Sequence, residues 1–481
     1  MRRRRSIFLA IGGVALVAIV AGGTLLAVRR AGSGPTAPPG PVVVRWFVGF
    51  GTGLMPSQTD VQQAFVDRYN RSQSRIHLDL QVVTSGSAMA LSYYLPTFIE
   101  NGTFDILGPL GVGTLNGFDG KLLDLAPLVR KHKFNLAQFP PAMVDILKRG
   151  SALVSLPYGI YPAFLLYNKD LFAAAGLPDL PTHIGQTYMG KTWDWAEVRA
   201  IGMKLTLDSK GRHPYDPGFD ADDIVQFGLD FQYWDGRRIA AAFGQAGAQL
   251  VDPADPSKAK LSDNFKAAVK YFYDGMWTSH FIPTGKYRAS DLLNGGATFA
   301  SGKIAMNASN TWCLGGCYFG DVGATKMHAV GIAVMPSYNG VTAGPLDFDG
   351  FSITKGSKHP DEAFQAMLAV MAEPTLLDAY GELPAVVSQR ASWEQAQTAA
   401  ATSYFPTVTS LSWSAVEEMA AHPADPSHEG YMPNYTKAVT DYGTTFTDLQ
   451  NTPGLNVDDE LANLQKTLQT DFDATGTPSP P

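Results

Sequence analysis

The sequence predicts an α/β protein with two lobes, each a mainly parallel sheet flanked by helices. The chain has 481 residues, more than one compact core usually holds, so two lobes or domains are expected. Strand-like and helix-like segments alternate along it, which favours parallel sheets. Hydrophobic residues make up 45% and charged residues 17% of the chain, which is typical of globular rather than disordered or fibrous proteins.

Three strands are predicted in the first quarter of the chain. Residues 42–47 form a β-branched run that ends in aromatic side chains, which favours a strand. Residues 76–83 alternate strictly between apolar and polar side chains, which predicts a strand with one solvent-exposed face. Residues 104–107 predict a short buried strand, followed by a turn-rich stretch.

Four helices are predicted from apolar side chains at helical spacing. Pro360 fits the first turn of the helix predicted to contain Ala363 to Met371, where a missing N–H costs nothing. The apolar stripes are Val61, Ala64, Phe65 and Tyr69; Phe265, Ala268, Val269, Phe272 and Met276; Ala363, Phe364, Met367, Leu368 and Met371; and Leu461, Leu464, Leu468 and Phe472.

Residues 1–30 have the features of an export segment. Arg2 to Arg5 precede an apolar run of 22 residues, Ile7 to Val28. A membrane-spanning helix needs about 20 apolar residues, whereas a cleaved signal peptide has an apolar core of about 7 to 15. The run is interpreted either as an uncleaved anchor with a cytoplasmic N-terminus or as a long signal peptide cut near Ala27 or Ala31. Both place the rest of the chain outside the cytoplasm.

Two short segments are predicted to lack regular structure. Residues 31–41, AGSGPTAPPGP, are typical of a tether. Residues 474–481 end in TGTPSPP and predict a disordered tail.

The charge of the chain argues against a nucleic-acid partner. The formal net charge is −7, and it becomes −13 when the six basic residues of the first 30 positions are left out. Nucleic-acid-binding proteins carry a basic surface instead. The nine histidines, including His132, His183, His213, His328 and His359, are dispersed without ligand spacing, so neither a metal site nor a cofactor is predicted.

The two cysteines rule out a disulfide scaffold and an all-Cys metal site. Cys313 and Cys317 are separated by Leu-Gly-Gly, and the two glycines would permit the turn of a small disulfide in an oxidising compartment. Two reduced thiols are the alternative.

Aromatic residues, rather than catalytic motifs, indicate a function. No G-x-S-x-G elbow, phosphate-binding loop or H-E-x-x-H motif occurs. Many aromatics stand next to Gly, Pro, Asp or Asn, which places them on loops, where function tends to lie. Trp and Tyr combine a flat apolar face with a polar group, which suits the C–H faces and hydroxyls of a sugar ring. These residues are Trp46, Phe47, Phe50, Tyr158, Tyr161, Phe164, Tyr233, Trp234, Trp312, Phe348 and Phe351.

Five phrases occur along the chain in a fixed order. The first contains a buried strand at 164–167, Asp170 as the cap of the next turn and Gly176 as its end. Together the phrases resemble the extracellular solute-binding proteins of ABC importers, in particular the maltose- and sugar-binding group. The phrases are Leu156 to Pro178 (LPYGIYPAFLLYNKDLFAAAGLP), Lys191 to Trp195, Phe299 to Trp312, Val330 to Pro360, and Glu382 to Pro384.

The resemblance implies a two-lobed, periplasmic-binding-protein-like α/β fold with a ligand cleft between the lobes. Tyr161 would make a polar ligand contact, and Tyr233, Trp234 and Trp312 would be stacking platforms. The chain departs from the family pattern after Asp105, where Leu-Gly-Pro-Leu-Gly replaces an aromatic or charged contact, and the usual lipid-anchor cysteine is missing. The implied ligand-binding residues are Phe50, Asp105, Tyr158, Tyr161, Tyr233, Trp234, Asn310, Trp312, Asp349, Phe351 and Glu382.

The resemblance also implies a domain plan and partners. Residues 42–160 with about 350–430 would form lobe 1, and residues 161–349 with about 431–473 lobe 2. The chain would cross at 161–167, 349–352 and 432–435. A monomer on the outer side of the bacterial plasma membrane would bind a sugar or oligosaccharide and deliver it to ABC permease subunits, without catalysis.

Three other interpretations stay open. A secreted carbohydrate-active enzyme would use a carboxylate pair, with Asp347, Asp349 and Glu382 as candidates. A receptor that presents its solute to a sensor would share the same cleft. Polyamine and iron binders share the architecture too. Tyr93-Tyr94 could form a ferric-site pair, but packing in an amphipathic helix is the favoured interpretation of these tyrosines.

Overall fold

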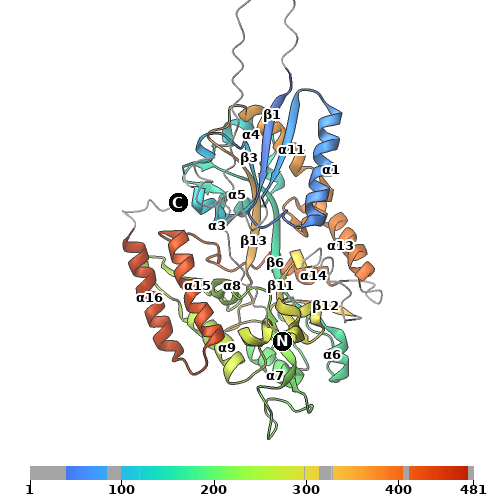
Figure 1. Ribbon diagram of the computed structural model, residues 1–481, viewed down its shortest axis with the longest axis vertical. Coiled ribbons are helices and arrows are strands. Elements are labelled where there is room, and N and C mark those ends of the chain that lie inside the picture. Colours follow the sequence, from blue (N-terminus) through green and yellow to red (C-terminus); the bar gives the residue numbers. More distant parts are fainter. Residues whose placement is uncertain are drawn as a thin grey trace, which may run out of the picture. The chain divides into compact units, whose positions relative to one another are not determined.

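The computed structural model describes residues 40–83, 99–118, 120–296, 298–313, 327, 329–404 and 411–474. In these ranges ten strands form one sheet in the order β2-β1-β3-β13-β6-β11-β8-β7, with β12 and β14 also paired to β6 (Figure 1). The strands are β1 (Val42–Val48), β2 (Ile76–Val82), β3 (Ile106–Gly111), β6 (Leu156–Asn168), β7 (Leu207–Asp208), β8 (Ile224–Phe231), β11 (Ile304–Asn310), β12 (Val330–Ala333), β13 (Leu346–Ile353) and β14 (Leu383–Pro384).

Strand β6 connects the two halves of this sheet. Its first part pairs antiparallel with β13, where Tyr161 lies opposite Asp347. Its second part pairs antiparallel with β11, where Leu166 lies opposite Asn307. All 13 residues of β6 are buried. Figure 1 shows β6 and β13 side by side between an upper and a lower group of helices. The result is the predicted α/β architecture of two lobes joined by crossing strands.

Parallel pairing is confined to the strands inside each lobe. β1 pairs in parallel with both β2 and β3, and β8 pairs in parallel with β11. β13 is antiparallel to β3 and to β6, because the chain leaves one lobe along β6 and returns along β13. The predicted mainly parallel sheets are therefore mixed at the crossing.

The helices that cover the sheet bury the predicted apolar stripes. In α9 (Asp263–Trp277) and α16 (Val457–Asp473) every predicted residue is buried. In α11 (Pro360–Met371), Ala363, Phe364 and Met367 are buried, and Pro360 occupies the first turn. The other helices named below are α1 (Pro56–Ser72), α3 (Val112–Leu115), α6 (Lys169–Ala174), α7 (Trp195–Leu205), α8 (Gly236–Ala241), α12 (Pro374–Tyr380), α14 (Trp413–Ala420) and α15 (Tyr435–Asn451).

The buried face of α1 differs from the prediction. It consists of Gln58, Gln62, Phe65 and Val66, whereas Ala64 is exposed. Gln62 faces the core because its amide donates hydrogen bonds to the backbone oxygen of Gly53 and to the hydroxyl of Tyr380, over 3.1 and 2.8 Å. A search for apolar side chains at helical spacing does not find a buried glutamine, whose burial depends on its hydrogen-bond partners.

Two local predictions change as well. β3 starts at Ile106 rather than at residue 104 and continues through Gly111, because this stretch pairs with β1 and β13. Helix α6 is capped by Asn168, whose side chain accepts hydrogen bonds from the backbone N–H groups of Asp170 and Leu171; Asp170 itself lies in the first turn. Gly176 follows the helix with a φ of 66°, as predicted for its end.

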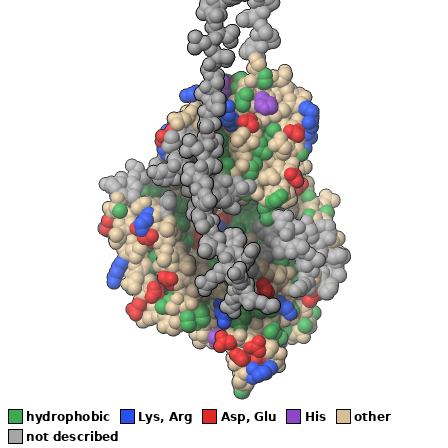
Figure 2. All heavy atoms as spheres, in the orientation of Figure 1, with side chains coloured by type: hydrophobic (Ala, Val, Ile, Leu, Met, Phe, Trp, Pro, Cys, Tyr) green, Lys and Arg blue, Asp and Glu red, His purple; other side chains and the backbone are tan. Residues whose placement is uncertain are grey.

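Some predictions lie outside the described residues. These are the anchor or signal peptide, nearly all of the tether, the tail from residue 475, Tyr93-Tyr94, His328 and Cys317. Within the described ranges, no helix combines the length and hydrophobicity that crossing a membrane requires. The face visible in Figure 2 carries Lys and Arg interspersed with Asp and Glu.

Candidate ligand-binding cleft

A cleft of about 470 Å³ lies where the crossing strands meet loops from both halves of the sheet. Its volume is in the range typical of small-molecule sites. Ligands of α/β proteins bind beyond the carboxyl ends of parallel strands, and the loops after β1, β8 and β11 contribute here. The lining residues are Phe50, Gly51, Thr52, Met55, Gln58, Gly111, Thr114, Tyr161, Tyr233, Arg238, Trp312, Asp347, Asp349, Tyr380 and Glu429.

One wall is an aromatic cluster formed by Tyr161, Tyr233 and Trp312. The Trp312 ring lies edge-on to Tyr161, with ring centroids 4.9 Å apart, and to Tyr233 at 5.6 Å. The indole N–H of Trp312 donates a 2.7 Å hydrogen bond to Oε1 of Gln232, which fixes the ring plane. Tyr233 is 48% exposed. The cluster therefore offers fixed and partly solvent-exposed rings to a ligand.

Another part of the lining comes from the loop after β1. Phe50 packs against Phe47 and Phe118, with ring centroids 5.2 and 5.6 Å away. Gly51 and Gly53 have φ values of 116° and 87°, which only glycine adopts readily. These two residues turn the chain so that the hydroxyl of Thr52 donates a 2.7 Å hydrogen bond to Oδ2 of Asp349.

Asp349 in the cleft lining and Glu382 behind it form a buried carboxyl pair. The two side chains share a hydrogen bond. Glu382 has no exposed surface, and its Oε1 accepts a 2.7 Å hydrogen bond from the hydroxyl of Tyr161. The hydroxyls of Thr52 and Tyr161 are 3.1 Å apart. The network thus joins the loop after β1 to both crossing strands.

Burial controls the ionisation of this pair. It raises the pKa of Asp349 to about 6, although hydrogen bonds from Thr52 and Glu382 oppose the shift. Burial, together with the negative charge of Asp349, raises the pKa of Glu382 well above its ordinary value. Two like charges in contact without solvent are unfavourable, so the pair retains a proton.

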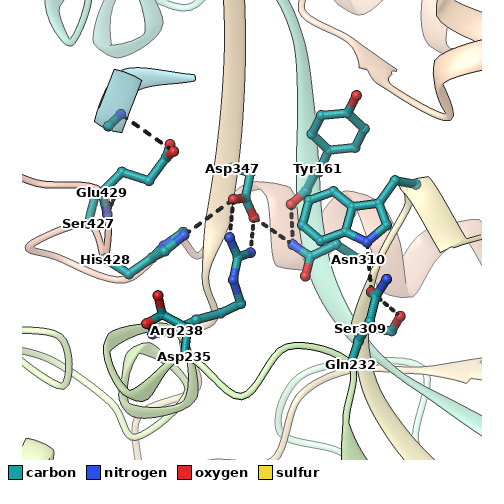
Figure 3. A network of polar contacts seen from close by, with 12 residues as sticks. Tyr161, Gln232, Asp235, Arg238, Ser309, Asn310, Asp347, Ser427, His428 and Glu429 are labelled. Carbon is teal, nitrogen blue, oxygen red and sulfur yellow. Dashed lines mark hydrogen bonds and ion pairs between the residues drawn. The ribbon is translucent and has the colours of Figure 1, made fainter. Parts of the chain in front are cut away.

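An ion pair between Arg238 and Asp347 forms the floor of the cleft (Figure 3). Both terminal nitrogens of Arg238 donate to the carboxylate of Asp347. Asp347 also accepts a 3.1 Å hydrogen bond from the amide of Asn310 and lies 3.3 Å from Nε2 of His428. Burial alone would raise the pKa of Asp347, but the charge of Arg238 holds it below the ordinary value. Asp347 is therefore ionised.

The structure brings five of the eleven predicted ligand-binding residues into the cleft lining and leaves six outside it. Phe50, Tyr161, Tyr233, Trp312 and Asp349 line the cleft. Asn310 and Glu382 lie directly behind it, because their side chains bind Tyr161 and the carboxyls of the cleft. Asp105, Tyr158, Trp234 and Phe351 do not line the cleft.

These last four residues have structural partners. Asp105 accepts hydrogen bonds from the backbone N–H of Arg45 and from the hydroxyl of Ser357, over 2.9 and 2.6 Å. Tyr158 and Phe351 pack edge to face in the core. The indole of Trp234 donates to Asp230 and lies under the guanidinium of Arg288. These contacts account for the four side chains without a ligand, and their predicted contact with a ligand stays a prediction.

Sequence reasoning missed several lining residues. Arg238 is the fourth residue after Trp234 and lies in the first turn of α8, which Asp235 caps. The aspartate at this helix start is the sequence feature that could have indicated a polar group near Trp234. Asp347 was singled out only as a candidate of the rival enzyme. Thr52 and Glu429 stand in loops without any periodic pattern, so nothing in the sequence marks them.

Two further predictions concern metal ligands and the two cysteines. In the part of the chain that the structure describes, no three His, Cys, Asp or Glu side chains are grouped to hold a metal ion. Cys313 is buried, and its thiol donates to Oε1 of Gln232. The disulfide with Cys317 stays a prediction.

Comparison with known proteins identifies the family. Residues 54–374 match the family model described as bacterial extracellular solute-binding protein. The chain belongs to this family. No curated protein matches the sequence. The family consists of binding proteins rather than enzymes, and its match covers the crossing strands and most of the cleft.

Solved structures similar to this solute-binding protein share its fold. An ABC substrate-binding protein from Listeria monocytogenes in complex with cycloalternan has a TM-score of 0.66 at 15% identity, covering 90% of this chain and 99% of the other. The sugar-binding protein MalE from Xanthomonas citri has a TM-score of 0.64 at 17% identity, covering 90% and 98%. A cyclic alpha-maltosyl-1,6-maltose binding protein from Arthrobacter globiformis has a TM-score of 0.62 at 19% identity, covering 91% and 100%.

Proposed function

We propose that this solute-binding protein captures a sugar or oligosaccharide in the cleft and delivers it to an ABC permease. The observation that carries the proposal is a cleft lined by the aromatic cluster of Tyr161, Tyr233 and Trp312 together with hydrogen-bonding groups of Thr52 and Asp349. Flat rings match the C–H faces of a sugar, and carboxyl and hydroxyl groups match its hydroxyls. Similar structures from other bacteria bind cycloalternan and cyclic maltosyl-maltose, which supports a saccharide here.

Capture would proceed by closure of the two lobes over the ligand. The crossing strands β6 and β13 connect the lobes and carry Tyr161 and Asp349, so a ligand that touches either residue also touches the hinge. It shifts the population towards the closed form only by its additional affinity for that form. The permease would recognise the closed form. Residues 1–30 would either anchor the protein at the outer face of the plasma membrane or be removed on export.

A ligand screen tests the class of solute. Full-length protein in a mild detergent is heated with sugars, oligosaccharides, amino acids, polyamines and metal salts in separate samples. A ligand present at about 100 times its Kd stabilises the folded state by about 2.7 kcal/mol, so a saccharide is expected to raise the Tm. A shift with amino acids, polyamines or metals alone contradicts the proposal. Small-angle scattering with the best saccharide should also show a smaller radius of gyration.

Replacing Trp312 by alanine is expected to raise the Kd of the saccharide found in the screen about 30-fold or more, as for a central aromatic contact. Trp312 is half-buried at the cleft, so the substitution removes a ring that ligand would cover. Titration calorimetry of Trp312→Ala measures the loss. Trp413→Ala is the matched control, because Trp413 is half-buried outside the cleft and packs on Trp393. An unchanged Kd for Trp312→Ala would place ligand elsewhere.

The alternative of a carbohydrate-active enzyme has a direct test. Its candidate carboxyls are Asp347, which is committed to Arg238, and the buried pair Asp349 and Glu382. A binding protein releases its saccharide unchanged. Steady product release from an oligosaccharide at protein concentrations far below that of the substrate would establish the enzyme instead.

A further inference from the structure

The described lining of the cleft includes one basic side chain, and that side chain is already paired with a carboxylate of the protein. Among the described residues that line the cleft, only Arg238 is basic. Its guanidinium faces Asp347 with two parallel hydrogen bonds, the geometry that pairs arginine with carboxylates most strongly. The same guanidinium lies 5.3 Å from the ring centroids of both Tyr233 and Trp312. Its planar face and two of its N–H donors are therefore engaged before any ligand arrives.

Asp347 keeps its position without help from a ligand. Asn310 donates to its Oδ2, and Nε2 of His428 lies next to its Oδ1 (Figure 3). Asn310 also donates to the backbone oxygen of Tyr161 on the paired strand. Asp347 is only 9% exposed. Removing the partner of such a buried charge is energetically unfavourable. Displacement of Asp347 from Arg238 by a solute would therefore cost free energy.

Carboxyl groups surround this floor. Asp349 and Glu429 line the same cleft, and Oε2 of Glu429 is buried without a hydrogen-bond partner. Asp235 caps the helix that carries Arg238. Burial and the charge of Arg238 lower the pKa of His428, which keeps that side chain neutral. A phosphate or carboxylate on a solute would meet carboxyl groups here and no unpaired cation among the described lining residues.

We infer that Asp347 determines the specificity of the cleft: by neutralising Arg238 it makes the site reject anionic solutes and accept uncharged saccharides. This inference rests on the proposed function, since it defines which saccharides the same cleft takes. It assigns Asp347 to selectivity, not to catalysis and not to direct ligand contact. Loss of the carboxylate charge should turn Arg238 into an anion-binding group.

Inorganic phosphate is the probe, because it tests the state of Arg238 independently of the natural ligand. Wild-type protein should show no specific phosphate binding in titration calorimetry. Asp347→Asn keeps the size of the side chain and leaves Arg238 without its counter-charge, so it should bind phosphate at least about tenfold more tightly than the wild type, as expected for a charge-assisted hydrogen bond. Adding Arg238→Gln to Asp347→Asn should abolish the gain.

Two controls separate this result from general effects. Asp263→Asn makes the same change in net charge at a fully exposed side chain in the first turn of α9, and it should gain no phosphate binding. Melting curves of every variant report folding. If Asp347→Asn does not fold, the wild type still decides: in matched pairs such as glucose with glucuronate and maltose with maltobionate, the uncharged member should bind more tightly.

Each outcome has a distinct meaning. Phosphate binding by the wild type, or a folded Asp347→Asn variant without any gain, overturns the inference. Tighter binding of the anionic member of a pair by the wild type overturns it as well. If no saccharide binds the wild type while Asp347→Asn gains phosphate binding, the proposed function is wrong, but the inference that Asp347 neutralises Arg238 is supported.

Discussion

Replacing Glu382 by glutamine is expected to stabilise the protein at pH 8 by roughly 1 to 3 kcal/mol, the usual cost of a buried polar group that lacks a satisfactory partner. In the wild type, the folded state holds protons on Asp349 and Glu382 more tightly than the unfolded chain does, because both pKa values are raised by burial. Stability is therefore fully present below the ordinary carboxyl range near pH 4, and it is lost as the pH rises through the raised pKa of each carboxyl, which is about 6 for Asp349.

A glutamine at position 382 removes this dependence without removing the contacts. Its oxygen can still accept from the hydroxyl of Tyr161, and its amide can donate to an ionised Asp349. Urea unfolding between pH 4 and pH 9 measures the effect: the gain in unfolding free energy should be large at pH 8 and small at pH 4. Asp263→Asn, at an exposed carboxyl, should leave the pH curve unchanged. Parallel curves for Glu382→Gln and wild type would show that the pair holds no extra proton.

Gly228→Ala is expected to destabilise the protein by about 3 kcal/mol or more, at the upper end of what overpacking costs. A Cβ on Gly228 of β8 would lie 2.1 Å from the backbone oxygen of Gly202 and 2.3 Å from its Cα in α7. Thr206 fixes this contact, since its hydroxyl donates to the Gly202 oxygen and accepts from the Gly228 N–H. Backbone atoms on both sides leave no flexible side chain that could move away.

The substitution also reaches the cleft. β8 leads directly into Gln232 and Tyr233, so a shift of β8 away from α7 should weaken saccharide binding together with stability. Gly443→Ala is the control, because a Cβ there meets no atom within 4 Å and Gly443 lies within α15, where alanine is favoured by about 1 kcal/mol. Thermal unfolding compares the two. Equal and small changes for both variants would mean that α7 and β8 are not packed at backbone distance.

The elements that could be predicted from sequence are those with one buried and one exposed face. The stripes of α9 and α16 and the alternation of residues 76–83 record this asymmetry directly, because each position shows which side is in water. The end of α6 was also readable, because glycine readily adopts the positive φ that Gly176 has there. The family phrases added the two-lobed fold and the crossing strands.

The choice of cleft residues could not be made in the same way. β6 is buried along its whole length, so no alternation separates Tyr158, which faces the core, from Tyr161, which faces the cleft. Trp234 follows Tyr233, yet of the two only Tyr233 lines the cleft, because Asp230 and Arg288 hold the Trp234 ring elsewhere.

Local pattern thus established the α/β alternation, the helix faces and the set of aromatics from which the cleft wall is drawn. The electrostatics of the floor came only from the tertiary structure. Arg238 and Asp347 are 109 positions apart, and Asp349 and Glu382 meet because β13 and the turn after α12 both lie against β6. A charge or a pKa depends on what lies within a few ångströms, and such neighbours are brought together by chain crossings that no periodicity encodes.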